Sequence, residues 1–387
     1  VVPEEEAEPR RVKVAVLLPL NVESNKLPSM GIFEQDTAEV RASDERWRLD
    51  TKSDIFVQFY QGVLMAADSL KRDGYTLDLH VFDTRRDVAE CGRLAGALNM
   101  LAPDLIVGPV FANEFRAVAE QLGDKTIPMI YPLSSRRDDL GRFPNMIQMN
   151  ESEASLIEDM AEWVGTHAGA ARLIQVSPEP AFVKRWAGSD FVTLVRGHLP
   201  EGKRDSIVDL RWRAQMSLDS IRKSLDKNRE NVILFPTVNE AAASRVLPVL
   251  SALADDYRLT LIGFPEWLRF TSVDDEVYFK LNTKMFANHH VDHESPEAEA
   301  FASRFRENFH EEPGTIANRA FDMVLYFIPL VDAERRALLQ ELPDRPGNGL
   351  FTRFRFQRAG EGMSLENRGL YMVNYRFDYT IVVAPVR

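Results

Sequence analysis

Short apolar runs alternate with amphipathic segments along most of the chain. The first run is RVKVAVLLPL at residues 11–20, and similar runs begin near residues 77, 105 and 171. Between the runs, apolar side chains recur every three or four positions, as they do over residues 55–70. An apolar run that is bounded by turn residues and followed by such a segment is typical of a buried parallel strand and its crossover helix. The pattern therefore predicts an α/β protein in which most strands run parallel.

The runs fall into two groups, which predict two lobes, each a mostly parallel sheet flanked by helices. Strands of the first lobe are expected at residues 12–18, 77–83, 105–109, 128–132 and 146–149. Strands of the second lobe are expected at residues 173–176, 206–210, 232–235, 259–263 and 284–288. The expected crossovers between the lobes are helices over residues 151–167 and 316–330. Segments that alternate as antiparallel strands do follow at residues 351–356, 368–375 and 379–384.

The same pattern predicts the boundaries of the domains. Residues 1–10 have the composition of an acidic linker, which we expect to follow a processed signal or an upstream segment. The first lobe is expected to comprise residues 11–150 and 316–387, and the second residues 151–315. A long polar insertion at residues 21–53 interrupts the first lobe, and loops of this length are usually functional or disordered. Several crossings between the lobes predict a hinge.

Composition narrows the classes of function. The chain has 387 residues, enough for two cores, and 45% of them are hydrophobic. No run of about eighteen apolar residues occurs, so we expect no membrane span. The formal net charge of -12 speaks against a nucleic-acid partner, because phosphate binding needs a basic face. Cys91 is the single cysteine, so no intrachain disulfide can form.

Motifs for catalysis are missing from the sequence. It contains no Gly-x-Ser-x-Gly elbow, no glycine-rich phosphate loop and no His-Glu-x-x-His pair. Cys91 falls within an expected helix and has no histidine near it in the sequence. We therefore expect a binding protein that is not an enzyme and uses no cofactor. Its ligand should bind at the carboxyl ends of the strands, where parallel sheets hold their ligands.

Five segments together resemble the type I periplasmic binding proteins, the family of branched-chain amino-acid binding proteins and of some extracellular ligand-binding receptors. They are VAVLLPL at 14–20, FYQGVLMAAD at 59–68, DLIVGP at 104–109, IPMIYPLSS at 127–135 and FDMVLY at 321–326. The resemblance covers residues 11–387 and implies a two-lobed protein of the periplasm or cell envelope that closes on a small ligand. The insertion and the last strands look most like a branch in which this domain follows a LysM module. That branch would bring peptidoglycan as a partner, through a module N-terminal to this sequence.

Carried over residue by residue, the family's ligand contacts fall on strand-end loops of both lobes. In this sequence they are Asn113, Leu133, Ser134, Ser135, Phe182, Thr237, Asn239, Glu266 and Trp267. One loop departs from the family's pattern, because residues 110–113 read VFAN and lack the hydroxyl that amino-acid binders offer to a carboxylate. The resemblance implies a small polar ligand of unknown identity. An amino acid, a short peptide and a cell-wall fragment are the classes to test, and the departure speaks against an amino acid.

Several of these positions also have a purely structural interpretation. Ser134 and Ser135 could bind a polar ligand or could cap a turn. Arg136 and Arg137 could bind an anion or could be neutralised by the two aspartates that follow them.

The aromatic candidates divide in the same way. Glu266 beside Trp267 could hold a cationic group against an aromatic wall, or could be an exposed glutamate next to a core tryptophan. Phe182 and Trp186 could form a second wall, although helical packing produces the same spacing.

Residues 288–294, NHHVDHE, are the one metal-like cluster in the sequence. His289 and His293 would have to meet across an irregular turn, because neighbouring strand residues point to opposite faces. The alternative is a polar segment at the hinge that titrates near neutral pH. Spacing favours the alternative, so we expect no metal site.

Two other functions stay open beside the binding protein. The chain could have kept the fold and lost the ligand, acting as a protein-interaction scaffold or as a regulator of cell-wall enzymes, with the insertion covering the cleft. A hydrolase or transferase that uses scattered loop residues is the third interpretation. The binding protein is the leading hypothesis because the strand-end loops carry polar residues but no catalytic set.

Overall fold

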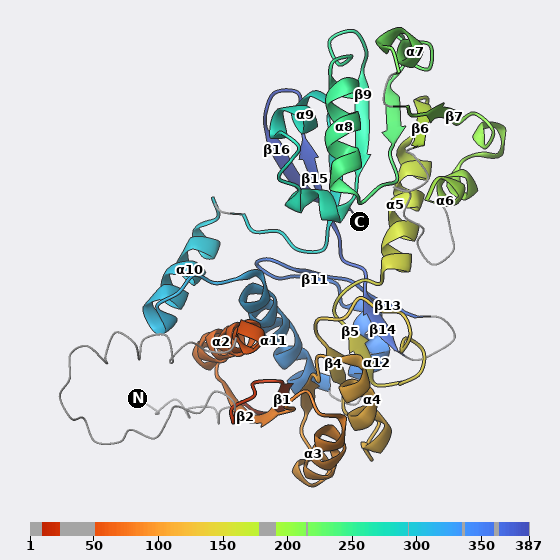
Figure 1. Cartoon of the computed structure of the whole chain (residues 1–387). Coiled ribbons are helices and arrows are strands. Elements are labelled where there is room, and N and C mark those ends of the chain that lie inside the picture. The colour runs from red at the N-terminus through yellow and green to blue at the C-terminus, as the bar shows by residue number, and fades with distance from the viewer. Residues whose placement is uncertain are drawn as a thin grey trace, which may run out of the picture. The chain divides into compact units, whose positions relative to one another are not determined.

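The computed structural model describes residues 10–23, 51–177, 191–213, 216–292, 294–334, 337–359 and 364–386. These residues form two compact units, both visible in Figure 1. The described residues within 1–151 and 289–368 make the first unit. Those within 152–288 and 369–387 make the second.

The first unit is built on a sheet whose strands lie in the order β13-β14-β5-β4-β3-β1-β2. These strands are β1 (Arg10–Leu18), β2 (Tyr75–Asp83), β3 (Leu105–Val107), β4 (Met129–Tyr131), β5 (Met146–Gln148), β13 (Phe356–Arg358) and β14 (Leu365–Asn367). All neighbours pair in parallel except β13, which runs antiparallel to β14. The sheet is therefore mostly parallel, as the sequence predicts.

Helices cover both faces of this sheet. They are α2 (Thr51–Arg72), α3 (Val88–Leu101), α4 (Ala112–Gln121), α10 (Pro296–Phe309), α11 (Thr315–Glu334), α12 (Leu338–Glu341) and the short η5 (Leu342–Asp344). A separate pair of short antiparallel strands consists of β11 (Gly347–Asn348) and β12 (Arg353–Phe354). Val14 and Val16 of β1 pack in one core with α2 and α11, whereas Ala15 and Leu17 pack in another with α3 and α4. The strand is buried on both faces, which explains why its sequence is a continuous apolar run.

Gly62 allows α2 and α11 to approach each other closely. A Cβ at this position would lie 2.2 Å from the carbonyl oxygen of Ala317 on α11. Gly96 of α3 is a matched control, because a Cβ there meets no heavy atom within 4 Å. We expect Gly62→Ala to lower the free energy of unfolding by about 1–3 kcal/mol through steric conflict. Gly96→Ala should raise it by about 0.5–1 kcal/mol, because alanine restricts the unfolded chain.

Urea denaturation followed by far-UV circular dichroism measures both variants. A Gly62→Ala protein as stable as the wild type would contradict the close contact between the helices.

Asp322 of α11 is a buried carboxylate that organises the segment before β12. Its Oδ1 accepts a hydrogen bond from the backbone N–H of Leu350 at 2.8 Å. Its Oδ2 accepts two more, from the N–H of Phe351 at 2.7 Å and of Thr352 at 2.6 Å. Only 1% of the residue is exposed. Burial raises the pKa of Asp322 to about 6, although the three donors act in the opposite direction.

The second unit repeats the architecture with strands in the order β16-β15-β10-β9-β8-β6-β7. They are β6 (Arg172–Ser177), β7 (Val208–Arg211), β8 (Asn231–Leu234), β9 (Leu259–Gly263), β10 (Lys284–Ala287), β15 (Tyr371–Tyr375) and β16 (Ile381–Pro385). Strands β6 to β10 pair in parallel, and β15 and β16 extend the sheet in antiparallel fashion.

The helices of the second unit pack with this sheet around one hydrophobic core. They are α5 (Glu153–His167), α6 (Phe191–His198), α7 (Leu218–Arg222), α8 (Glu240–Ser251), α9 (Asp275–Lys280) and the short η4 (Pro265–Arg269). The short η3 (Glu201–Lys203) has no buried residue. No helix in the described ranges is long and apolar enough to cross a membrane.

The units divide the chain differently from the lobes expected from the sequence. The first unit resumes at His289 rather than at residue 316, and it therefore includes α10. Residues from Gly369 onward belong to the second unit, because β15 pairs with β10 along Met285 and Val373. Alternation predicts that a segment is a strand, but not which of two sheets it joins.

Candidate ligand site at the carboxyl ends of the strands

The parallel strands of the first unit end at one edge of the sheet, where Asp83 ties two of them together. Its Oδ1 accepts hydrogen bonds from the backbone N–H of Asn21 and of Arg85, both at 3.0 Å. Its Oδ2 accepts one from the N–H of Val22 at 2.9 Å. The segments that follow β1 and β2 are thus held side by side.

The backbone at this edge adopts conformations that residues other than glycine rarely take. Asn21, Arg85 and Arg86 have φ angles of 50°, 53° and 54°. Gly108, after β3, has a φ of 91°, and a Cβ there would lie 2.3 Å from the carbonyl oxygen of Leu17. Such conformations concentrate at ligand-binding sites, because the surrounding structure must hold them in place. They mark this edge as the candidate site.

Arg86 is the cation of this edge. Its guanidinium carbon lies 4.3 Å from the centroid of the Phe111 ring, and Phe111 in turn meets Phe56 edge-to-face at 5.8 Å. Among the described residues, the Arg86 side chain has no hydrogen-bond or ion-pair partner within bonding distance. Its donors therefore remain available to a ligand, while the aromatic ring fixes the position of the charge.

Glu114, in the first turn of α4, is a buried acid next to Arg86. Only 4% of the residue is exposed. Burial raises the pKa of Glu114, whereas the neighbouring Thr84 hydroxyl and the Arg86 charge lower it. The sequence analysis missed both Arg86 and Glu114. The available signal was the position of Thr84-Arg85-Arg86-Asp87 directly after a strand, which is where a ligand binds.

The first-unit residues predicted to contact a ligand lie on this edge, and most of them serve the local structure. Asn113 is exposed in the first turn of α4, and its Oδ1 accepts a hydrogen bond from Arg116 at 3.3 Å. The Leu133 side chain packs against the core, and the Ser134 Oγ accepts a hydrogen bond from the N–H of Arg136 at 3.1 Å. Ser135 is exposed, so its side chain is accessible from solvent.

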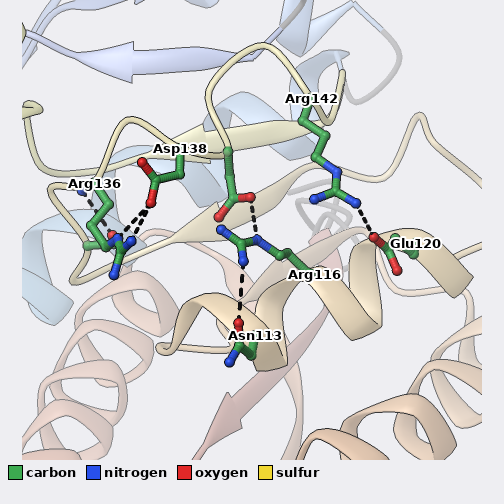
Figure 2. Close-up of polar contacts among 8 residues, drawn as sticks. Asn113, Arg116, Glu120, Arg136, Asp138 and Arg142 are labelled. Atoms are coloured by element: carbon green, nitrogen blue, oxygen red, sulfur yellow. Dashed lines mark hydrogen bonds and ion pairs between the residues drawn. The ribbon is translucent and has the colours of Figure 1, made fainter.

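Figure 2 shows how the charged side chains of α4 and of the loop that follows β4 are paired. Arg136 points to Asp138, with 3.0 Å between its Nε and the carboxylate, and Arg142 points to Glu120. Arg116 donates to the buried Asp139 at 2.6 Å. Arg136 therefore fits the self-neutralising interpretation, in contrast to Arg86.

Three of the second-unit residues predicted to contact a ligand, Thr237, Asn239 and Trp267, are connected by hydrogen bonds. Asn239 caps α8, since its Oδ1 accepts a hydrogen bond from the N–H of Ala242 at 2.9 Å. The buried Thr237 accepts from the N–H of Asn239 at 3.1 Å, and its carbonyl accepts from the Trp267 indole at 2.7 Å. Trp267 is 1% exposed, whereas Glu266 is partly exposed. Burial favours a core tryptophan beside an accessible glutamate.

An open hollow lies beyond the carboxyl end of β7 in the second unit. Its volume is about 830 Å³, and it is lined by Asp209, Leu210, Arg211, Arg213, Met216, Ser217 and Ser220. Asp209 accepts a hydrogen bond from the Ser177 hydroxyl at 2.6 Å and from Arg211 at 3.2 Å. The carboxyl edge of this sheet is therefore polar as well.

Among the residues that the structure describes, His289 packs against an aromatic side chain. Its ring stacks on Phe351 with 6.1 Å between centroids. Burial lowers the pKa of His289 to about 3, with further contributions from Arg319 and His290, so the ring stays neutral near pH 7. No group of three or more histidine, cysteine, aspartate or glutamate side chains suited to a metal occurs there. His293, Phe182 and Trp186 lie outside the described residues.

Known structures share the fold of this chain. A branched-chain amino acid ABC transporter protein from Rhodospirillum rubrum is 13% identical, over 97% of this chain and 100% of that one, with a TM-score of 0.64. A branched-chain amino acid periplasmic ligand-binding protein from Burkholderia xenovorans is 12% identical, over 96% and 94%, with a TM-score of 0.53. An ABC transporter substrate-binding protein from Desulfitobacterium hafniense, solved with leucine, is 14% identical, over 97% and 100%, with a TM-score of 0.50. No protein-family model and no curated protein sequence matches the chain.

The chain therefore has the type I periplasmic-binding fold. Its two mostly parallel seven-stranded sheets, counted over the described residues, confirm the fold class predicted from the sequence. At these identities the likeness concerns the fold alone, because one fold supports many functions.

Proposed function

We propose that this protein is a non-enzymatic solute-binding protein of the cell envelope, and that its ligand carries a carboxylate. The observation that carries the proposal is Arg86. It rests on Phe111 at the carboxyl edge of the first sheet and has no hydrogen-bond or ion-pair partner among the described residues. A guanidinium matches a carboxylate in shape and charge. Arg86 can thus supply the donors that the VFAN loop at residues 110–113 lacks.

The ligand classes follow from this chemistry. Amino acids, short peptides and cell-wall peptide fragments all carry a carboxylate, and the solved relatives of this fold include an amino-acid complex. In a protein of this type, the ligand stabilises the closed form only through contacts that it makes there and not in the open form. We propose that Asn239 and Glu266, which are partly exposed, make such contacts in the second unit. We propose the envelope location by analogy with the periplasmic ligand-binding protein of this fold.

Thermal unfolding against a panel of solutes tests the proposal. The panel contains amino acids, dipeptides, muropeptides, neutral sugars and divalent metal ions. A ligand at a hundred times its dissociation constant stabilises the folded state by about 2.7 kcal/mol. We expect a rise in melting temperature with one class of carboxylates and none with neutral sugars.

Arg86→Gln is the decisive variant for this site. Loss of the charged donor should weaken binding of the active carboxylate about tenfold or more, since a hydrogen bond to a charged group is worth about 1.5–3 kcal/mol. Arg136→Gln is the matched control, because Arg136 lies on the same edge and already pairs with Asp138. It should leave the affinity unchanged. Equal effects of the two substitutions would remove Arg86 from the site.

A protein-interaction scaffold is the second candidate. It is favoured by the side chains of Ser134, Asn239 and Trp267, which are engaged in hydrogen bonds within their own unit. A panel in which no solute raises the melting temperature would support this function over the first.

A further inference from the structure

A second cavity lies at the opposite end of the strands, within the second unit alone. Its volume is about 430 Å³, and it lies between the end of α5 and the amino ends of β8, β9 and β10. The residues that matter here are Trp163, His167, Val232, Thr260, Ile262 and Lys284. Cavities of 300–1,000 Å³ with mainly apolar walls and a few polar groups are typical of sites for small molecules.

The strand register explains how this cavity is lined. Thr260 of β9 pairs with Val232 of β8, and Ile262 pairs with Lys284 of β10. Because paired residues and residues two apart point to the same face of a sheet, these four side chains lie together on one face. They form a floor with an apolar centre and a lysine at one side.

Trp163 forms a fixed aromatic wall over this floor. Its ring stacks on that of His167, with 4.4 Å between centroids and 11° between planes. It also meets Phe286 edge-to-face at 5.8 Å. A wall held from two sides offers a flat apolar surface at little cost in side-chain entropy.

The charges of the described lining residues leave the ammonium of Lys284 available to a ligand. The Glu230 carboxylate accepts a hydrogen bond from the Thr260 hydroxyl, whose oxygen accepts another from the Asn282 amide at 2.9 Å. Lys284 is only partly exposed, and among the described residues its ammonium makes no hydrogen bond or ion pair. Burial lowers the pKa of Lys284, and Glu230 acts against this shift. An unpaired ammonium away from water is unfavourable, so an anion that entered the cavity would be stabilised by it.

We propose that this cavity binds a small organic carboxylate, with its apolar or aromatic body against Trp163 and its carboxylate on Lys284. Arg258 lies at the rim, where it donates a hydrogen bond to the carbonyl of Asn228 at 2.8 Å, and adds positive potential. The site is separate from the carboxyl-edge site, because it lies at the amino ends of the strands.

Isothermal titration of the full chain with 3-phenylpropionate tests the assignment, with 3-phenylpropylamine as the probe of opposite charge. We expect the carboxylate to bind and the amine to bind at least tenfold more weakly. Lys284→Met keeps the length of the side chain and removes its charge, so it should weaken carboxylate binding about tenfold or more. Equal binding of the two probes, or unchanged affinity in Lys284→Met, would overturn the assignment.

Glu230→Gln gives a second test, in which the affinity for the carboxylate should rise rather than fall. This variant tests the assignment even if Lys284→Met does not fold. Removing the competing negative charge should tighten carboxylate binding severalfold, so an unchanged or weaker affinity counts against the assignment. Arg86→Gln tells the two proposed sites apart. Binding of 3-phenylpropionate that is lost in Arg86→Gln but kept in Lys284→Met would place the probe at the carboxyl-edge site and overturn the assignment.

Discussion

Replacing Asp322 with alanine is expected to lower the free energy of unfolding by about 3–5 kcal/mol at pH 5, because two buried N–H groups and one partly buried N–H group lose their acceptor. Each buried donor without a partner costs about 1–3 kcal/mol, and water that enters the space left by the side chain recovers part of this. Urea denaturation measures the change.

Asp332→Ala is the matched control for this prediction. Asp332 lies on the same helix, is exposed, and only approaches Arg10 at 3.8 Å. Its removal should change stability by less than about 1 kcal/mol. Equal effects of the two substitutions would show that Asp322 does not organise the segment before β12.

The pH dependence of the Asp322 effect has a definite sign. The folded-state pKa of about 6 is above the ordinary value of 3.8. The stability that the raised pKa of Asp322 adds to the folded state is therefore full below pH 3.8 and is lost as the pH rises through 6. The stability difference between the wild type and Asp322→Ala should narrow by about 1 kcal/mol from pH 5 to pH 7. A difference that widens over this interval would contradict the raised pKa.

Trp267→Ala is the second substitution with a large expected effect. The indole packs near Phe235 and Phe264, both with 6.1 Å between ring centroids, and it donates to the Thr237 carbonyl. We expect a loss of about 3–5 kcal/mol in the free energy of unfolding, since removing a buried aromatic ring leaves a cavity.

Glu266→Gln is the neighbouring control, because Glu266 is partly exposed and its substitution should change stability by less than about 1 kcal/mol. Urea denaturation compares the two variants. A stable Trp267→Ala protein that has lost its ligand response would instead make the indole a wall of the binding site.

The order of secondary-structure elements could be predicted from the sequence because the central strands of each sheet are buried on both faces. β1 and β8 each lie largely within an apolar run, and turn residues separate the runs along the chain. The resemblance to type I periplasmic binding proteins is confirmed at the level of the fold. The last two strands show the limit of such reasoning. Their alternation is the same whether they pair with β10 or with the other sheet, and only the tertiary structure decides.

From the sequence, the candidate site could be placed at the carboxyl edge of the sheet but not at particular residues. The loops after β3 and β4 were predicted from the general position of ligands in parallel sheets. Arg86 was not predicted to contact a ligand. Arg85 and Arg86 lie between Asp83 and Asp87, and such a mixture of opposite charges is typical of a solvent-exposed turn. Its contact with Phe111 joins residues from two loops, and no sequence pattern records such a contact. The burial of Trp267 was likewise undecided until its neighbours were known.

The discontinuity of both units has a consequence for the order in which the protein can fold. The sheet of the first unit needs Leu365, which pairs with Ile147, and that of the second needs Val373, which pairs with Met285. During synthesis, neither sheet can be complete before residues 365–385 leave the ribosome, although most domains form as soon as their own residues emerge. A nascent chain that has emerged as far as residue 350 would therefore hold two unfinished sheets with exposed strand edges. A chaperone that covers such edges would bind the chain best at this stage.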